Sequence, residues 1–203
     1  MIVVALEGLD GSGKTTLCRA LSSADWSDHR VACLTSPSET VSRLCYEWRG
    51  RNIHASALGF LLGTKLMLRE LSDKYDLVVF DRYLLSTLVH HFGAVEGSET
   101  EFDGFLRAMD YHAPDLTIYL DCPVSVSLSR ISRRAGDRPL VVSLEAQREL
   151  YLSIPKGRKL HSWLSNRTIQ LNNGDEVNFD QTVKSAYDAI CQLLRRNSAA
   201  RVS

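Results

Sequence analysis

The sequence predicts an α/β protein built on a five-stranded parallel sheet that is flanked by helices. Two observations support this prediction. Short runs rich in Val, Ile and Leu alternate along the chain with longer segments of helical spacing. The most apolar of these runs contain almost no polar residues, which is typical of strands buried on both faces under covering helices.

The predicted strands are short, and turn or charged residues bound most of them. "IVVAL" at 2–6 and "LVVF" at 77–80 are continuous apolar runs. The other three are "RVACLT" at 30–35, "LTIYLD" at 116–121 and "RTIQL" at 167–171. Because a helical segment separates each strand from the next, neighbouring strands are expected to run parallel.

The helices between the strands are predicted from apolar residues at helical spacing. Pro123 suits the first position of a helix, because that position needs no backbone N–H donor. Pro155 is expected to bend the long helical segment 143–163. The predicted helices are 13–24, 40–49, 55–75, 85–92, 101–109, 123–134, 143–163 and 180–196.

Length favours a single domain spanning 1–203, or one domain with a small lid. The 24 Lys and Arg residues balance 24 Asp and Glu residues, which argues against a nucleic-acid or membrane surface as the partner. Five scattered cysteines suggest neither a disulfide framework nor a zinc site. No apolar run approaches the ~18 residues of a membrane span, so we expect a cytoplasmic protein.

"EGLDGSGKTT" at 7–16 matches the phosphate-loop pattern G-x-x-x-x-G-K-[ST] between a predicted strand and a predicted helix. The glycines let backbone N–H groups converge on phosphate oxygens, at the positive end of the following helix. Lys14 is expected to reach the β- and γ-phosphates of ATP, and the Thr15 hydroxyl to bind Mg²⁺. The motif therefore predicts a P-loop NTPase fold. The expected ATP-binding residues of the loop are Gly8, Leu9, Asp10, Gly11, Ser12, Gly13, Lys14, Thr15 and Thr16.

A kinase is favoured over a GTPase switch, because the chain has no Asn-Lys-x-Asp motif for reading guanine. Asp81 and Arg82 follow the apolar run 77–80, at the edge of a parallel sheet where ligands bind. Asp81 is expected to hold Mg²⁺ or its water shell, and Arg82 to grip a phosphate with its two-pronged guanidinium. The alternative is a helix-capping Asp beside an exposed Arg.

"RISRRAGDR" carries four arginines within nine residues, around a glycine that allows movement. We interpret 133–142 as a lid that closes over the triphosphate and neutralises the phosphoryl group in transfer. The alternative is a solvated basic loop. The arginines are Arg130, Arg133, Arg134 and Arg138.

At these motifs the chain resembles the thymidylate kinases, a family of P-loop nucleoside monophosphate kinases. "EGLDGSGKTT" is similar to the P-loop of that family, and "DRYLLST" to its DR[YH]-x-x-S segment. "PDLTIYLDCPVSVSLSRI" resembles the strand and helix before the family's lid. "EAQRELYLSI" resembles the helix after the lid, including Tyr151.

The resemblance implies roles for the matching positions. Asp10 would lie between the donor and acceptor phosphates, and Arg82 would bind the acceptor phosphate. Ser86 would lie beside the acceptor base, and Arg130 near the adenine of ATP. The lid would supply the catalytic arginine, because no Arg or Lys precedes Lys14 in the P-loop. The implied catalytic residues are Lys14, Asp10, Arg82, Arg133, Arg134 and Arg138.

The acceptor side departs from the family pattern. Where the family has Arg-Glu-Pro-Gly-Gly-Thr, this chain has "TSPSET" at 35–40, which lacks the arginine that helps hold the acceptor phosphate. Arg43 is a candidate replacement. Phe60 and Lys65 are the nearest candidates for the pair that contacts the base, and His91 aligns with a glutamine near the base. The expected acceptor-binding residues are Phe60, Arg82, Ser86, His91 and Tyr151.

These observations lead to three functional hypotheses. The first is an ATP- and Mg²⁺-dependent transferase of nucleotide biosynthesis that converts dTMP to dTDP, acting as a homodimer. The second is a nucleoside or other small-metabolite kinase on the same scaffold, with Glu39 as a possible base. The third is a nucleotide-binding subunit without catalysis, which the lid arginines disfavour because binding alone does not need them.

Overall fold

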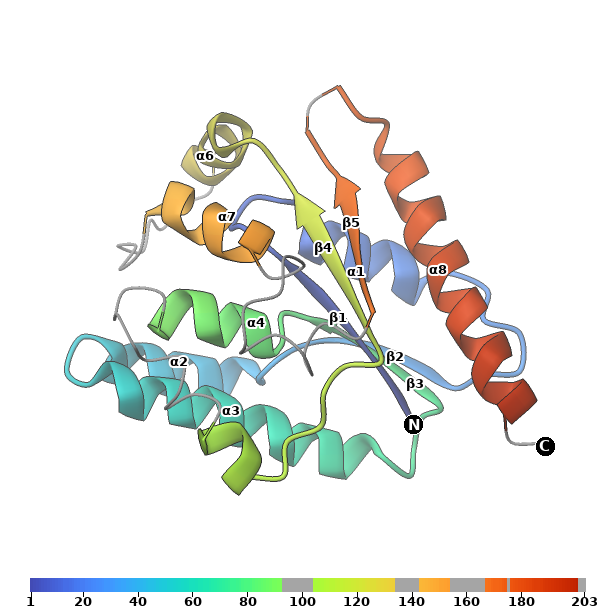
Figure 1. Cartoon of the computed structure of the whole chain (residues 1–203), viewed down its shortest axis with the longest axis horizontal. Coiled ribbons are helices and arrows are strands. Elements are labelled where there is room, and N and C mark those ends of the chain that lie inside the picture. Colours follow the sequence, from blue (N-terminus) through green and yellow to red (C-terminus); the bar gives the residue numbers. More distant parts are fainter. Residues whose placement is uncertain (93–103, 134–142, 154–166, 175, 201–203) are drawn as a thin grey trace.

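A computed structural model describes residues 1–92, 104–133, 143–153, 167–174 and 176–200. Its five strands form one parallel sheet in the order β2-β3-β1-β4-β5 (Figure 1). This arrangement confirms the predicted fold class. The strands are β1 (Ile2–Gly8), β2 (Val31–Thr35), β3 (Leu77–Asp81), β4 (Leu116–Asp121) and β5 (Thr168–Asn172).

Helices connect and cover the strands much as the sequence predicts, although several differ in extent from the prediction. The helix predicted at 55–75 ends at residue 71. The segment predicted as one helix at 85–92 begins as α-helix and continues as a wider π-helical turn. Of the segments predicted at 101–109 and 143–163, residues 104–108 and 144–153 are helical, while 101–103 and 154–163 lie outside the described residues. The helices are α1 (Lys14–Ser22), α2 (Glu39–Arg49), α3 (Ile53–Leu71), α4 (Leu84–Thr87), the π-turn η1 (Leu88–Phe92), α6 (Val124–Ser132), α7 (Leu144–Ser153) and α8 (Phe179–Ala200).

The sheet is buried between two layers of helices, as its apolar strands require. All seven residues of β1 are buried, and successive side chains point to opposite faces. Val3, Ala5 and Phe80 pack with α3, α4 and α7 on one face. Val4 and Leu6 pack with α1 and α8 on the other (Figure 1).

Two glycines of α3 let α2 pack directly against it. A Cβ atom at Gly59 would lie 2.6 Å from Cys45 Sγ, and one at Gly63 would lie 2.7 Å from Val41 Cγ1. Val41 and Cys45 are one turn apart, so they define the face of α2 that meets α3. This contact fixes which α2 side chains point toward the carboxyl edge of the sheet.

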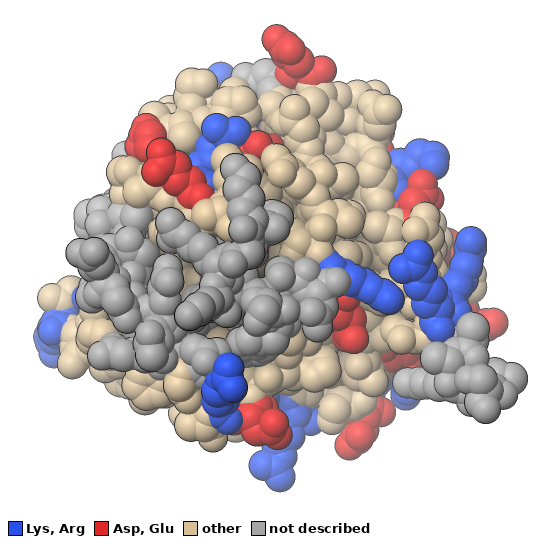
Figure 2. Space-filling model, viewed as in Figure 1, with Lys and Arg blue, Asp and Glu red and all other residues tan. Residues whose placement is uncertain are grey.

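On the face drawn in Figure 2, the basic and acidic side chains of the described residues are interspersed. Within the described ranges, no helix combines the length and the apolar character that crossing a membrane requires.

Candidate active site

The phosphate loop joins β1 to α1 and depends on glycines at three left-handed positions. Gly8, Gly11 and Gly13 have φ values of 146°, 80° and 98°, which side chains with a Cβ atom rarely adopt. The side-chain amide of Asn173 donates to Ser12 O at 2.6 Å. A Cβ atom at Gly13 would lie 2.4 Å from that amide nitrogen, so Gly13 is needed for space as well as for conformation.

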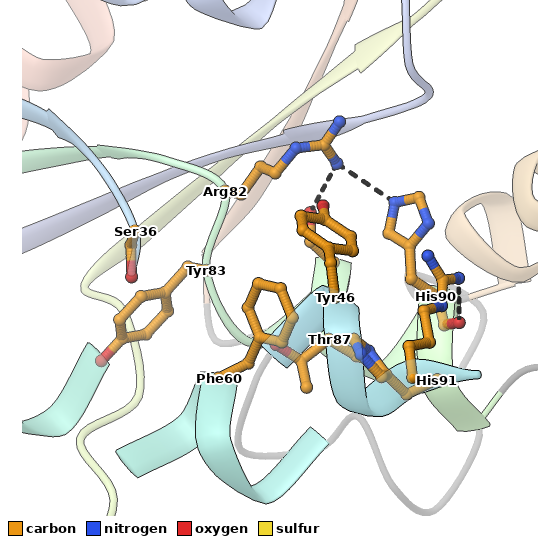
Figure 3. A pocket seen from close by; sticks show the side chains of 10 residues that line it. Ser36, Tyr46, Phe60, Arg82, Tyr83, Thr87, His90 and His91 are labelled. Atoms are coloured by element: carbon orange, nitrogen blue, oxygen red, sulfur yellow. Dashed lines mark hydrogen bonds between the residues drawn. The ribbon is translucent and has the colours of Figure 1, made fainter. Parts of the chain in front are cut away.

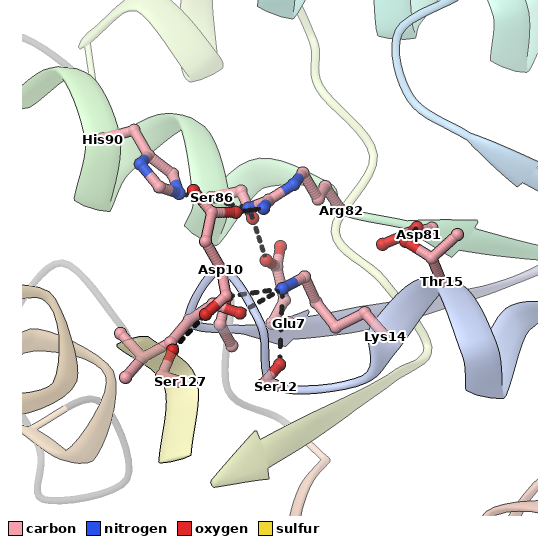
Figure 4. Close-up of polar contacts among 12 residues, drawn as sticks. Glu7, Asp10, Ser12, Lys14, Thr15, Asp81, Arg82, Ser86, His90 and Ser127 are labelled. Atoms are coloured by element: carbon pink, nitrogen blue, oxygen red, sulfur yellow. Dashed lines mark hydrogen bonds and ion pairs between the residues drawn. The ribbon is translucent and has the colours of Figure 1, made fainter. Parts of the chain in front are cut away.

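Lys14 lies with its ammonium in the middle of this loop (Figure 4). It donates to Gly8 O at 2.9 Å and to Leu9 O at 2.6 Å, and lies 3.4 Å from Ser12 Oγ. The side chain is buried, so its charge is concentrated at the loop. A phosphate that enters the loop meets a positioned cation and the first N–H groups of α1.

Thr15 and Asp81 meet as the Mg²⁺ prediction requires. The Thr15 hydroxyl donates to Asp81 Oδ2 at 2.6 Å. Asp81 Oδ1 is buried and has no hydrogen-bond partner among the described residues. A buried oxygen without a partner lowers the stability of the fold unless a ligand binds to it. Mg²⁺ in phosphoryl-transfer sites takes one or two protein oxygens and fills its shell with phosphate and water, so these residues fit the ion. The described residues contain no cluster of three His, Cys, Asp or Glu that would suit a different kind of metal site.

Arg82 leaves β3 in a strained conformation and turns toward the P-loop. Its φ is 77°, unusual for a residue with a side chain, and its N–H donates to Leu6 O at 3.0 Å. The guanidinium forms an ion pair with Asp10 and also lies 3.1 Å from His90 Nε2 (Figure 4). Ser127 Oγ donates to the backbone oxygen of Asp10 from α6. Asp10 and Arg82, predicted to flank the transferring phosphate, are thus held together.

Glu7 supports the segment that follows Arg82. This fully buried carboxylate accepts the N–H groups of Tyr83 at 3.0 Å and Leu85 at 3.1 Å, and the Ser86 hydroxyl at 2.5 Å. Ser86 Oγ also lies 3.2 Å from the hydroxyl of Tyr151. The structure therefore brings together Ser86 and Tyr151, both predicted to bind the acceptor, and it holds Ser86 with a carboxylate that the sequence analysis missed.

Replacing Glu7 with Gln is expected to remove one pH-dependent part of the stability. Burial raises the pKa of Glu7 above its ordinary value of 4.5, so the folded protein holds this proton more tightly than the unfolded chain. The stabilisation that comes from this proton is fully present below pH 4.5, the ordinary pKa of the carboxyl group. It is lost as the pH rises through the raised pKa of the folded protein. Glu7→Gln should therefore gain unfolding free energy relative to wild type as the pH rises above 4.5, in urea unfolding at a series of pH values.

The exposed Glu70→Gln variant is the matched control for this measurement. Its unfolding free energy should follow that of the wild type at each pH. A difference between Glu7→Gln and wild type that does not change with pH would contradict the prediction.

A pocket opens beside Arg82, between α2, α3 and η1, where the acceptor is expected (Figure 3). It is called the acceptor pocket below. Phe60 contacts Tyr46 edge-on, with ring centroids 5.4 Å apart, and packs on the ring of His91 at 5.0 Å. His91 Nδ1 lies 3.1 Å from Thr87 O and Nε2 lies 3.0 Å from Ser56 Oγ. Burial lowers the pKa of His91 to about 4, so its ring is neutral near pH 7 and lines the pocket as a flat wall.

Three candidates of the sequence analysis lie elsewhere. Lys65 donates its ammonium to the backbone oxygens of Met109 and Asp110, so it points away from the acceptor pocket. Arg43 and Glu39 are exposed on α2 and do not line the pocket. The second hypothesis therefore loses its suggested base.

Arg130 lines a groove on the donor side of the P-loop. Its guanidinium donates to Gly11 O at 3.3 Å and Asn173 O at 3.1 Å. The groove is completed by Phe179, whose ring supplies a flat apolar surface of the kind an adenine packs on. Arg133 ends α6 as an exposed residue. Arg134 and Arg138 lie outside the described residues, as does 134–142 of the predicted lid.

The site residues that the sequence analysis missed are Glu7, Arg49, His90 and Asn173. Glu7 carried a signal, because it is a charged residue at the end of an otherwise apolar strand. Arg49 follows Val41 and Cys45 at intervals of four, but the sequence does not show that this face meets the site. Asn173 carried no signal, because its contact with the P-loop depends on the pairing of β5 with β4.

Comparison with known proteins agrees with this geometry. A family model described as thymidylate kinase matches residues 60–170. A probable thymidylate kinase of Pyrobaculum aerophilum is 32% identical over 164 residues, which cover 75% of this chain and 82% of the relative. The chain belongs to the thymidylate kinase family. A further family member, the probable thymidylate kinase of Methanococcus aeolicus, is 28% identical and aligns over 94% of both chains.

The fold of the thymidylate kinase family extends along nearly the whole chain. The solved thymidylate kinase of Candida albicans superposes with a TM-score of 0.68, covering 94% of this chain and 91% of that one at 18% identity. The segment matched by the family model contains Asp81, Arg82, Ser86, Arg130 and Tyr151. It begins after the altered segment 35–40, at which this chain departs from the family's usual motif.

Proposed function

We propose that the protein is a thymidylate kinase that transfers the γ-phosphoryl group of Mg-ATP to dTMP and forms dTDP. The observation that supports this proposal most strongly is the placement of Arg82. It is bound to Asp10 of the P-loop on one side and lines the acceptor pocket on the other. A guanidinium at this junction suits a phosphate more than a bare hydroxyl, which favours a monophosphate acceptor.

In this proposal the P-loop holds the β- and γ-phosphates and Lys14 offsets the charge that develops between them. Arg82 holds the acceptor phosphate in line with the γ-phosphate, and Asp10 keeps Arg82 in place. Thr15 and Asp81 hold Mg²⁺, which neutralises phosphate charge. Arg130 and the groove beside Phe179 receive the adenine.

The lid arginines are proposed to complete the catalytic charge, with Arg133, Arg134 and Arg138 as the candidates. Arg133 at the end of α6 follows the helix that touches Asp10 through Ser127. A single domain, a lid at 133–142 and a cytoplasmic location remain predictions of the sequence.

The test of the proposed function is an assay of the purified protein with Mg-ATP and either dTMP or thymidine. Conversion of dTMP to dTDP, followed by chromatography of the nucleotides, is the expected result. Phosphorylation of thymidine alone would favour the nucleoside kinase. Binding of ATP without transfer to either compound, measured by calorimetry, would favour a nucleotide-binding subunit.

We also propose that the kinase forms a homodimer through α2 and α3. Leu58, Leu62 and Leu66 recur every four residues on α3 and are 41%, 49% and 52% exposed. Leu44 and Trp48 on the adjoining α2 are exposed as well. A stripe along a helix can meet its own copy about a two-fold axis, which buries all of these side chains at once.

Leu62→Glu is expected to convert this dimer to a monomer, because it places a charge in the middle of an apolar interface. Leu128→Glu on α6 is the matched control, since Leu128 has the same exposed fraction of 49%. Light scattering on a size-exclusion column gives the mass of each variant. A wild-type protein that elutes as a monomer, or a Leu62→Glu variant that stays dimeric, would contradict the proposal.

A further inference from the structure

The acceptor pocket contains a cation that no motif assigned, the guanidinium of Arg49 in the last turn of α2. Arg49 Nη2 donates to the backbone oxygen of His90 at 2.8 Å. Arg49 Nε is buried and has no hydrogen-bond partner among the described residues. A buried donor without a partner is costly, so this side chain is poised for an acceptor atom that a ligand brings.

The packing of α2 explains why Arg49 faces the pocket. Arg49 follows Val41 and Cys45 at intervals of four residues, and both of these contact the glycines of α3. All three side chains therefore lie on one face of α2. Arg43 is two residues from Val41 and Cys45, falls on another face and is exposed. Arg49, and not Arg43, is therefore the arginine of α2 that lines the pocket.

The two arginines of the pocket differ in their surroundings. Arg82 is bound to Asp10 of the P-loop, so a phosphate that receives the γ-phosphoryl group must lie at that end. Arg49 lies one helical turn beyond Tyr46, close enough to His91 to affect its charge, and it lines the same pocket as the ring of Phe60. Flat rings are the surroundings in which a nucleobase packs, so Arg49 is placed at the base end of the acceptor.

We propose that Arg49 reads the base of the acceptor by donating hydrogen bonds to a ring carbonyl oxygen, and so selects keto pyrimidines over cytosine. This inference rests on the proposed function, because it takes the acceptor to be a pyrimidine monophosphate. A guanidinium has donors only. It therefore matches the O4 atom of thymine or uracil and opposes the amino group that cytosine carries at the same position. The arginine that the family carries near position 35, and that this chain lacks, helps to hold the acceptor phosphate. The role proposed for Arg49 concerns the base and does not replace it.

The test compares three ligands on the full-length protein by calorimetry and by steady-state kinetics. The monophosphates dUMP and dCMP differ in the base: dUMP has a carbonyl oxygen at position 4 and a proton on N3, whereas dCMP has an amino group at position 4 and no proton on N3. Thymidine lacks the phosphate. Arg49→Met should weaken the binding of dUMP and of thymidine by the same factor, about tenfold, and leave the binding of dCMP unchanged. Arg49→Lys keeps the positive charge but loses the two-pronged guanidinium. Its affinity for dUMP and thymidine should therefore lie between that of the wild type and that of Arg49→Met. The exposed Arg51→Met, two residues further along, should behave as wild type.

Two results would overturn the inference. Equal losses for dUMP and dCMP with thymidine unaffected would place Arg49 on the phosphate. No change with any ligand in either Arg49 variant would make Arg49 a packing residue only. A failure of the proposed function looks different, because it appears in the wild-type protein as a lack of dTMP turnover. A wild type that turns over dTMP while Arg49→Met keeps its preference for dUMP over dCMP removes this inference alone.

Discussion

Replacing Lys14 with Ala is expected to lower kcat by about a hundredfold or more, while the protein keeps its fold. The ammonium lies at the centre of the loop, within hydrogen-bonding distance of Gly8 O and Leu9 O. In the proposed mechanism the same charge offsets the negative charge that grows between the β- and γ-phosphates of ATP in the transition state. Removal of an interaction made mainly in the transition state lowers kcat more than it raises KM.

Two further variants separate charge from packing. Lys14→Met keeps most of the side-chain volume in this buried position, so it should lose activity to the same extent and retain the thermal stability of the wild type. Lys74→Ala removes an exposed lysine and should leave kcat unchanged. Single-turnover rates with dTMP measure the effect. A Lys14→Ala protein with more than half of the wild-type rate would refute the donor site.

The donor side could be predicted from sequence because its chemistry is local. The P-loop glycines, Lys14 and Thr15 lie within eight consecutive residues, and the left-handed φ values explain why glycine stands at those positions. Asp81 was predictable for a related reason, since it ends a buried strand at the edge where ligands bind. The distance of 2.6 Å between Thr15 Oγ1 and Asp81 Oδ2 follows from the pairing of β1 with β3.

The acceptor side was harder to predict because it depends on how helices pack. Arg49 lines the pocket and Arg43 does not, because the face of α2 that meets Gly59 and Gly63 carries Arg49. Lys65 looked close to Phe60 in sequence, yet five residues along a helix turn its side chain to a different side. It binds the backbone oxygens of Met109 and Asp110 instead. Tertiary contacts of this kind leave no pattern in the segment that they place.

Glu7 and His90 illustrate a second limit. Each was visible in the sequence, but neither type of residue indicates a role by itself. Glu7 becomes a support for Ser86 only because α4 begins against the end of β1. His90 becomes a neutral partner of Arg82 because its pKa is lowered. Burial is the main cause, and the nearby guanidiniums of Arg82 and Arg49 add to it. A neutral imidazole nitrogen can accept from a guanidinium, whereas a protonated one would repel it.

Arg82→Ala is expected to raise KM for dTMP and to lower kcat together, each by about tenfold or more. In the proposed site Arg82 would make two charge-assisted contacts with the acceptor phosphate, and such contacts are worth about 1.5–3 kcal/mol each. The substitution also leaves Asp10 without its cation beside the phosphates, which adds repulsion. The combined loss in kcat/KM should therefore exceed the effect of removing a distant arginine by about a hundredfold.

The Asp10 contribution can be isolated with a double-mutant cycle. Asp10→Asn in the Arg82→Ala background should recover part of kcat/KM, because it removes the unpaired carboxylate, although Asp10→Asn alone should reduce activity by loosening Arg82. The affinity for ATP, measured by calorimetry, should stay within about twofold of the wild type, since Lys14 and the loop backbone are intact. A rise in KM for dTMP with kcat unchanged would mean that Arg82 binds the acceptor without aligning it. Unchanged kcat and KM would place the acceptor phosphate outside the junction of the P-loop and the pocket, and the acceptor site would then have to be assigned again.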